Sequence, residues 1–245
     1  MNLPRPPRLL FAPPPRLVAF DLDGTLVDSV PDLAWCIDRT MARFGVPPRG
    51  EALVRRWVGN GVDRLVERAL TSEPDGRADP GLLREARAVF LDLYSVHGRD
   101  RSRIYPGVRN ALTALRAHGA TLACITNKPR RPAVDLLSHL ALLDSFDLVL
   151  GGDSLPRCKP DPLPLLHACS VLEVAVEHAL FAGDSINDVE AARAAGMRVA
   201  CVSYGYNHGR PISEAAPDAV VDSLEELTVL CFGVPKTARG GAAER

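Results

Sequence analysis

Five short apolar runs recur along this chain, and they constrain its fold more than any other feature. A segment with helical periodicity precedes each of the last four runs. The apolar runs are Leu17–Phe20, Thr121–Ile125, Asp147–Leu150, His178–Phe181 and Arg198–Val202, and the helical segments are 107–118, 129–140, 162–172 and 186–195. Continuous apolar runs are typical of strands that are buried on both faces of a parallel sheet. The alternation predicts an α/β fold, a doubly wound, Rossmann-like parallel sheet with its ligand crevice at the carboxyl ends of the strands.

The segment 28–103 interrupts this alternation, because it has helical periodicity and little strand signal. Its helical patterns cover 33–44, 53–57, 62–70 and 82–94. A helical insertion that leaves the sheet and returns to it predicts a small cap domain over the crevice. Proline-rich and glycine-rich ends predict tails that do not pack. We expect a disordered or loosely attached tail over 1–15, a core of 16–27 and 104–232, a helical cap over 28–103 and a flexible tail over 233–245.

Composition narrows the classes of function. The 29 Lys and Arg residues balance the 30 Asp and Glu residues, whereas a dedicated nucleic-acid surface has a basic excess. No apolar run approaches the ~20 residues of a membrane-spanning helix, and no signal peptide is recognised. The six cysteines are scattered without zinc-ligand spacing, as expected of thiols in a reducing compartment. We therefore expect a cytoplasmic protein, monomer or homodimer, with neither nucleic acid nor membrane as partner.

Two pairs of carboxylates follow strands of the predicted sheet. Asp21 and Asp23 follow the first strand, and Asp184 and Asp188 follow the fourth. Each pair alone has a plainer explanation, a surface turn for the first and a helix N-cap and first turn for the second. The carboxyl ends of parallel strands lie along one edge of a sheet, however, so all four carboxylates are expected to converge. A hard divalent cation, most simply Mg²⁺, offsets the repulsion of such a cluster.

Three more residues are expected at the same edge. Thr126 and Asn127 end the second strand and begin a helix, where a hydroxyl and free backbone N–H groups suit an anion. Lys159 lies in a proline-flanked loop and is one of only three lysines in an arginine-rich chain. This choice favours a compact point charge at the crevice, although a solvated loop lysine is the alternative.

Taken in order, these motifs resemble the haloacid dehalogenase superfamily. The resemblance runs from Asp-x-Asp-Gly-Thr at 21–25 to Gly-Asp-Ser-x-x-Asp at 183–188 and covers about residues 16 to 232, including the helical insertion. Phosphatases and phosphomutases of the superfamily have Asp where this chain has Asp23, whereas dehalogenases do not. The segments 28–33, 56–61 and 202–207 are similar to bacterial phosphoglycolate phosphatases, although sugar-phosphate phosphatases have similar caps.

The resemblance implies a mechanism. Asp21 is the nucleophile that forms an aspartyl-phosphate, and Asp23 is the general acid and base. Asp21, the backbone carbonyl of Asp23, and Asp184 hold Mg²⁺. The remaining implied roles are phosphoryl binding by Thr126, Asn127 and Lys159, and orientation of Lys159 or a metal-bound water by Asp188.

A loop of the predicted cap carries the expectation about substrate choice. Gly59, Asn60 and Gly61 either present backbone N–H groups to a substrate carboxylate or form a plain helix–helix turn. The expected reaction is hydrolysis of 2-phosphoglycolate, a small phosphorylated metabolite, to glycolate and phosphate. A phosphatase of a sugar phosphate such as N-acetylmuramate 6-phosphate, or a β-phosphoglucomutase-like phosphomutase, stays open. A response-regulator receiver shares Asp, Thr and Lys but is shorter and has no helical insertion.

Overall fold

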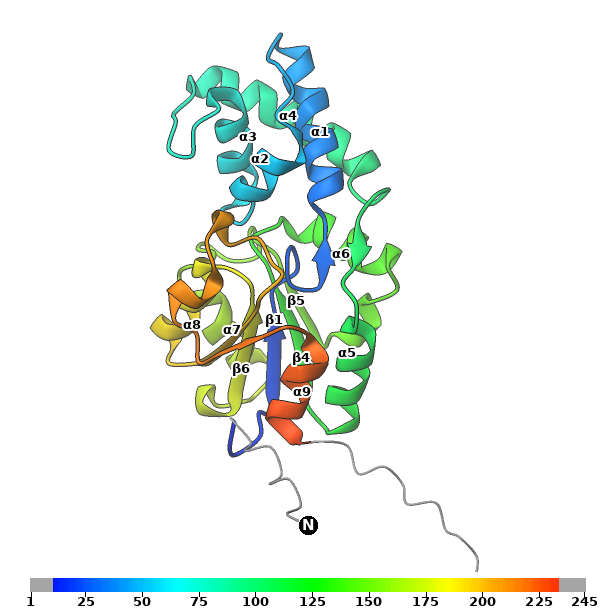
Figure 1. Cartoon of the computed structure of the whole chain (residues 1–245), viewed down its shortest axis with the longest axis vertical. Helices are drawn as coiled ribbons and strands as arrows, with labels where there is room; N and C mark the ends of the chain where they lie inside the picture. The colour runs from blue at the N-terminus through cyan, green and yellow to red at the C-terminus, as the bar shows by residue number, and fades with distance from the viewer. Residues whose placement is uncertain (1–10, 234–245) are drawn as a thin grey trace, which may run out of the picture.

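The computed structural model describes residues 11–233, in which six parallel strands form the central sheet (Figure 1). The strands run in the order β5-β4-β1-β6-β7-β8. Their bounds are β1 Leu17–Phe20, β4 Thr121–Ile125, β5 Leu148–Leu150, β6 Ala179–Gly183, β7 Arg198–Val202 and β8 Ala219–Val221. The chain builds the sheet outward on one side of β1 and then on the other, so the order reverses at β1. The predicted doubly wound sheet is confirmed, and its crevice lies at the carboxyl ends of β1, β4 and β6.

Five helices cover the two faces of this sheet. Helices α5, α6 and α9 pack on one face, and α7 and α8 on the other. Their bounds are α5 Val108–Ala117, α6 Arg130–His139, α7 Leu163–Val171, α8 Ile186–Ala195 and α9 Leu224–Phe232. Val18 and Phe20 of β1 pack toward α5, α6 and α9, whereas Leu17 and Ala19 pack toward α7 and α8. Both faces of the strand are buried, which explains its continuous apolar sequence.

Short 3₁₀ helices lie in the loops between these elements. Their bounds are η1 Leu143–Ser145, η2 Val176–His178, η3 Asn207–Gly209 and η4 Ile212–Ala215. The loop that carries η3 reaches from β7 toward the helices above the sheet and contacts α2. This loop therefore links the sheet edge to the segment described next.

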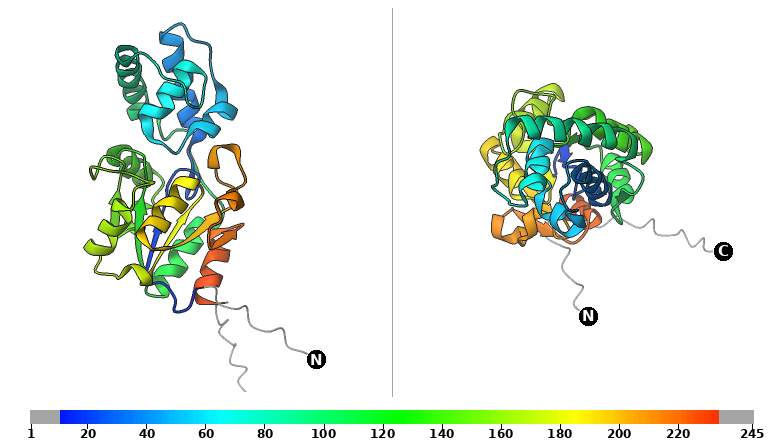
Figure 2. Two further views of the ribbon diagram at one scale, coloured as in Figure 1. Left: turned by 90° about the vertical axis from the view of Figure 1, so that its left-hand side faces the viewer. Right: turned by 90° about the horizontal axis from the view of Figure 1, so that it is seen from above.

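A helical insertion lies beyond the carboxyl ends of the strands (Figures 1 and 2). It consists of α1 Val30–Arg43, α2 Gly50–Trp57, α3 Gly61–Thr71 and α4 Pro80–His97. Chain entry and exit form an antiparallel two-stranded ribbon of β2 Val27–Asp28 and β3 Arg103–Ile104. The four helices share a hydrophobic cluster of their own, which includes Ile37, Val66 and Phe90. The helical periodicity of the sequence predicted helices in this segment, and the structure has them.

The prediction of a disordered or loosely attached tail over residues 1–15 is wrong near Phe11. Phe11 is only 1% exposed and belongs to the hydrophobic core. The Arg198 guanidinium lies 5.3 Å from the centre of its ring and donates a hydrogen bond to the Pro13 carbonyl at 3.3 Å. One aromatic residue thus anchors a segment whose proline content suggested that it would not pack. Residues 1–10 and 234–245 of the two predicted tails lie outside the described residues.

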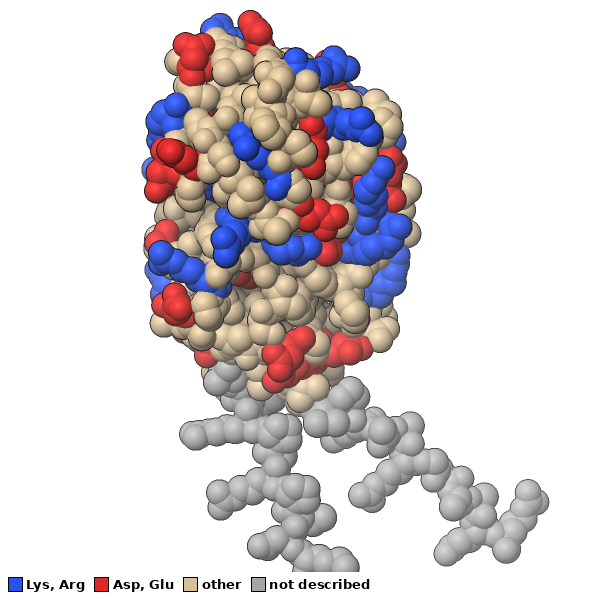
Figure 3. Space-filling model, turned by 45° about the horizontal axis from the view of Figure 1, so that its top comes forward, with Lys and Arg blue, Asp and Glu red and all other residues tan. Residues whose placement is uncertain are grey.

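Surface charge, helix length and cysteine burial relate to the expected partners and compartment of the protein. Basic and acidic side chains are interspersed over the face that Figure 3 shows. Within residues 11–233, the helices are all too short or too polar to cross a bilayer. Five cysteines are buried and Cys158 is exposed.

Candidate active site

Three carboxylates converge at the edge of the sheet. Asp21 follows β1, and its backbone N–H donates to the Ala182 carbonyl of β6 at 2.9 Å. Asp184 follows β6, and Asp188 lies in the first turn of α8. One carboxylate oxygen from each of these aspartates lies within 4.8 Å of the others, and all three residues are buried. The parallel pairing of β1 with β6 therefore brings together three of the four carboxylates that were predicted to converge, and the prediction is wrong for Asp23.

The cluster is electrostatically unfavourable without a cation. Burial raises the pKa of Asp21 to about 6, and the nearby Asp188 and Asp23 carboxylates add to this rise, while Lys159 opposes it. Burial likewise raises the pKa of Asp184 well above its usual range. Three carboxylate oxygens at this spacing are the donor set that a hard divalent cation takes. The residues present therefore fit such a metal.

Two contacts and two glycines hold Asp184 in place. Thr25 Oγ1 donates to Asp184 Oδ1 at 2.8 Å, and the Tyr206 N–H donates to Oδ2 at 2.8 Å. A Cβ atom at Gly24, where φ is +95°, would lie 2.4 Å from Asp184 Oδ2. At Gly205 it would lie 2.1 Å from the Asp184 Cβ. Glycine at both positions lets the loops approach this carboxylate.

Lys159 lies inside the cluster. Its Nζ lies 2.7 Å from Asp188 Oδ1 and 3.0 Å from Asp21 Oδ1. Burial acts to lower the pKa of Lys159, but the Asp188 and Asp21 carboxylates outweigh burial and raise it. The residue is 3% exposed, so the alternative of a solvated loop lysine is wrong. A charged ammonium beside Asp21 suits the binding of phosphoryl oxygens.

Asp188 combines two structural tasks. Its Oδ2 accepts from the backbone N–H groups of Asp184 and Ser185, at 3.1 and 3.0 Å, and from the Ser185 hydroxyl. With the Ser185 side chain these bonds form a capping box at the start of α8. Its other oxygen accepts from Lys159. The helix start thereby fixes the carboxylate that holds the lysine.

Asp23 lies apart from the three-carboxylate cluster and pairs with a lysine that the sequence analysis did not assign to the site. Lys128 Nζ donates to both carboxylate oxygens of Asp23, at 2.9 and 3.1 Å, and the Ser29 hydroxyl also donates to this carboxylate. Burial acts to lower the pKa of Lys128, but the Asp23 carboxylate raises it overall. The available signal was the position of Lys128 directly after Thr126 and Asn127, together with the rarity of lysine in the chain.

Thr126 and Asn127 directly follow β4, as predicted, but they do not begin the next helix, because α6 starts at Arg130. Thr126 Oγ1 accepts from the Lys128 N–H at 3.2 Å. Asn127 Nδ2 donates to the carbonyls of Gly59 and Lys159, at 2.9 and 2.8 Å. Asn127 therefore connects the helical insertion with the loop that carries Lys159.

The predicted loop at 59–61 contacts the core at the same place. Gly59 and Gly61 have φ values of +119° and +83° and line the cavity described below. The Gly59 carbonyl also accepts from Asn187 Nδ2 at 3.2 Å. The Asn60 side chain donates to Asn187 at 3.3 Å and accepts from Arg68 at 2.9 Å. The Asn60 amide is thus bonded to other protein groups.

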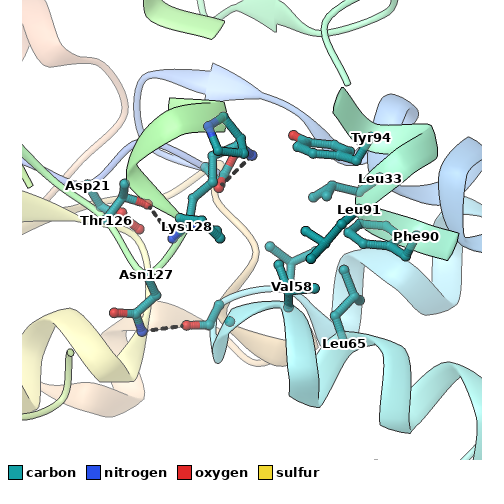
Figure 4. Close-up of a pocket in the computed structure, with 16 residues that line it drawn as sticks. Asp21, Leu33, Val58, Leu65, Phe90, Leu91, Tyr94, Thr126, Asn127 and Lys128 are labelled. Carbon is teal, nitrogen blue, oxygen red and sulfur yellow. Dashed lines mark hydrogen bonds and ion pairs between the residues drawn. The ribbon is translucent and has the colours of Figure 1, made fainter. Parts of the chain in front are cut away.

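A small cavity of about 50 Å³ separates the helical insertion from the aspartates (Figure 4). From the core it is lined by Asp21, Asp23, Thr126, Asn127, Lys128, Pro129 and Pro132. From the insertion it is lined by Leu33, Val58, Gly59, Gly61, Val62, Leu65, Phe90, Leu91 and Tyr94. One wall is polar and charged and the other is mostly apolar. Such a cavity can hold a small anion beside the Asp21 and Asp23 carboxylates.

Comparisons with known proteins agree with this geometry. The family model of haloacid dehalogenase-like hydrolases matches residues 15–196. A phosphoglycolate phosphatase from Nitrosococcus oceani is 49% identical over 87% of this chain and 95% of its own length. Another, from Thiobacillus denitrificans, is 48% identical over 90% of this chain and 97% of its own. The crystal structure of a predicted phosphoglycolate phosphatase from Haemophilus somnus matches with a TM-score of 0.82 and 37% identity, over 86% of this chain and 96% of that one.

Proposed function

This chain belongs to the haloacid dehalogenase-like hydrolase family, and we propose that it is a Mg²⁺-dependent phosphatase that hydrolyses 2-phosphoglycolate. The observation that carries the proposal is the buried Asp21 carboxylate, which lies 3.0 Å from Lys159 and beneath a small cavity. The relatives named phosphoglycolate phosphatase, similar over most of the chain, supply the substrate.

Asp21 is the proposed nucleophile. Its carboxylate forms a bond to phosphorus while the bond from phosphorus to the ester oxygen breaks, and Asp23 gives its proton to the leaving glycolate oxygen. Asp23 then removes a proton from the water that attacks the aspartyl-phosphate, which releases phosphate and restores Asp21. The contact between Asp23 and Lys128 fixes the carboxyl group for both proton transfers.

The remaining residues of the site stabilise charge. Thr126, Asn127 and Lys159 are proposed to bind the phosphoryl oxygens, and Asp188 orients Lys159 through the 2.7 Å contact. The side chains of Asp21 and Asp184, with the backbone carbonyl of Asp23, would hold Mg²⁺. When bound, the cation neutralises charge on the carboxylates and on the transferring phosphoryl group.

The helical insertion is proposed to act as a cap domain, with boundaries near 28 and 103. Its apolar wall keeps water from the site, and its loop at 59–61 contacts the core through Asn127 and Asn187. The small cavity supports a small substrate such as phosphoglycolate. A β-phosphoglucomutase-like reaction would need room for a sugar bisphosphate.

The proposal includes the compartment, the partners and the oligomeric state of the protein. Balanced charge, buried thiols and the lack of a bilayer-spanning helix within residues 11–233 support a cytoplasmic enzyme with no nucleic-acid or membrane partner. Both a monomer and a homodimer are compatible with this function.

Steady-state kinetics on a panel of phosphomonoesters test the function. We expect the kcat/KM for 2-phosphoglycolate to exceed the values for ethyl phosphate, glucose 6-phosphate and N-acetylmuramate 6-phosphate by ~10²-fold or more. EDTA should abolish turnover and Mg²⁺ should restore it. A preference for a sugar phosphate would refute the proposed substrate, activation by a sugar bisphosphate would indicate a mutase, and full turnover in EDTA would refute the metal.

A further inference from the structure

The helical insertion contributes one polar side chain to the cavity wall. Among the lining residues from the insertion, all but Tyr94 are Leu, Val, Phe or Gly. Tyr94 comes from α4, and Figure 4 shows its hydroxyl pointing toward the core. The residue is 5% exposed, and within residues 11–233 its hydroxyl makes no hydrogen bond of regular geometry, although it interacts with the nearby Lys128 ammonium. A buried hydroxyl without a partner is unfavourable, and at the wall of this cavity the Tyr94 hydroxyl is placed to donate to a ligand.

Lys128 brings the matching charge from the core. It alone is positively charged among the described residues that line the cavity, and its Nζ lies 4.9 Å from the centre of the Tyr94 ring. The Lys128 ammonium has three N–H groups, and the side chain it donates to within the described residues is Asp23. Both of these bonds go to one carboxylate, so an N–H group of the ammonium is left to donate to an anion in the cavity.

We propose that the Tyr94 hydroxyl and the Lys128 ammonium together bind the carboxylate of the substrate and thereby set the specificity of the enzyme. This inference rests on the proposed function, because 2-phosphoglycolate carries its carboxylate one carbon from the ester oxygen. With the phosphoryl group at Asp21, the carboxylate lies toward the insertion, where the Tyr94 O–H and a Lys128 N–H donate to its oxygens.

Other candidates for this role are engaged elsewhere. Arg55 donates to Asp28 at 3.2 Å, and its guanidinium lies 5.0 Å from the centre of the Tyr206 ring. Arg64 pairs with Glu67. Neither arginine lines the cavity. The loop at 59–61 offers backbone N–H groups but no charge.

Burial keeps Tyr94 a donor. It raises the pKa of this hydroxyl to about 12, so the phenol stays protonated at neutral pH. A neutral donor beside an ammonium gives the carboxylate one ordinary and one charge-assisted hydrogen bond. Ethyl phosphate has no carboxylate and would leave both donors without an acceptor. The cost of burying unpaired donors weakens the binding of such an analogue.

Binding of two inert analogues to the full-length protein tests the proposal. 3-Phosphonopropionate replaces the ester oxygen of 2-phosphoglycolate by a methylene group, and propylphosphonate has a methyl group in place of the carboxylate. Calorimetry with Mg²⁺ present gives the ratio of their Kd values. We expect the wild type to prefer 3-phosphonopropionate by at least ~10-fold, Tyr94→Phe to reduce this preference by at least ~5-fold, and Lys128→Met to abolish it.

Tyr105→Phe is the matched control, because the Tyr105 hydroxyl also has no partner among the described residues but does not line the cavity. This variant should keep the wild-type preference. If Tyr94→Phe and Lys128→Met bind both analogues in the wild-type ratio, the inference is wrong, even where the phosphomonoester panel supports phosphoglycolate. If the panel favours a sugar phosphate, the proposed function itself is wrong. In that case the wild type should bind the two analogues with a Kd ratio near one.

Discussion

At the scale of single residues, the account depends on how buried charges are compensated. Asp21 and Lys159 come from loops that are far apart in the sequence, yet their charged atoms lie 3.0 Å apart. Asp23 and Lys128 form a second pair at 2.9 Å. In our interpretation the first pair performs the phosphoryl transfer and the second transfers protons and recognises the substrate.

Asp21→Asn should eliminate turnover while preserving the fold, since the amide is nearly isosteric with the carboxylate but is not a nucleophile. We expect a loss of kcat of at least ~10³-fold, measured as phosphate release from 2-phosphoglycolate. Circular dichroism should match the wild type. Turnover near the wild-type rate, in protein shown by mass spectrometry to be free of deamidation, would exclude Asp21 as the nucleophile.

The raised pKa of Asp21 predicts a dependence of stability on pH in the metal-free protein. Asp21 titrates at about 6 when folded and at its ordinary value, 3.8, when unfolded, so the folded state binds more protons between these values. Stability should therefore fall as pH rises from about 4 to 6, by at most about 3 kcal/mol from this group. Mg²⁺ should raise the Tm more at pH 7.5 than at pH 4.5.

Asp21→Asn is the control for that measurement, because it removes the titrating group. Between pH 4 and 6, the Tm of the metal-free variant should fall less than the Tm of the metal-free wild type. Equal shifts of the wild-type Tm by Mg²⁺ at both pH values would show that the carboxylate cluster does not hold the cation.

At the scale of loops and elements, glycine at position 24 is required by contact with Asp184. Gly24→Ala would place its Cβ 2.4 Å from Asp184 Oδ2, so it should displace the proposed metal ligand. We expect at least ~10-fold weaker apparent Mg²⁺ affinity in the phosphatase assay. Gly119→Ala is matched, since φ there is +83° and nothing lies within 4 Å of the added atom. It should cost ~1–2 kcal/mol of stability and leave the Mg²⁺ dependence intact. Equal Mg²⁺ affinities for the two variants would contradict this assignment.

The sequence predicted the elements well where their patterns are long. Five of the six central strands and all four helices of the insertion were expected, because burial on one or two faces imposes a periodicity, whereas the three-residue strand β8 was not. The ribbon of β2 and β3 was not expected, since two residues in each strand are too few for a pattern. Phe11 was missed because local composition does not reveal an anchor that packs against residues far along the chain.

The site was predictable to the extent that chain order determines it. Parallel strands bring their carboxyl ends to one edge, so Asp21, Asp184 and Lys159 could be placed there from sequence. The pairing of Asp23 with Lys128, and the approach of Tyr94 to both, depend on how the insertion folds back over the sheet. No local pattern encodes that approach.

At the scale of the whole molecule, the function requires the insertion and the core to meet over the nucleophile. Asn127 and Asn187 both donate to the Gly59 carbonyl, at 2.9 and 3.2 Å, and so join the two parts beside the cavity. Asn187→Ala should loosen this contact and lower kcat/KM for 2-phosphoglycolate by roughly 3- to 30-fold. Hydrolysis of p-nitrophenyl phosphate, which needs no recognition of a carboxylate, should fall less. An equal fall in kcat/KM for both substrates would show that the contact does not contribute to recognition of the carboxylate.

The central claim is that Asp21 accepts the phosphoryl group, and trapping that adduct tests it most directly. Wild-type protein with Mg²⁺ and 2-phosphoglycolate is quenched in acid at a series of times, digested and mapped by mass spectrometry. The account predicts one phosphoryl group on the peptide that contains Asp21, labile to hydroxylamine and absent from Asp21→Asn. A phosphoryl group on another residue, or none at any quench time while phosphate is released at the full rate, would contradict it.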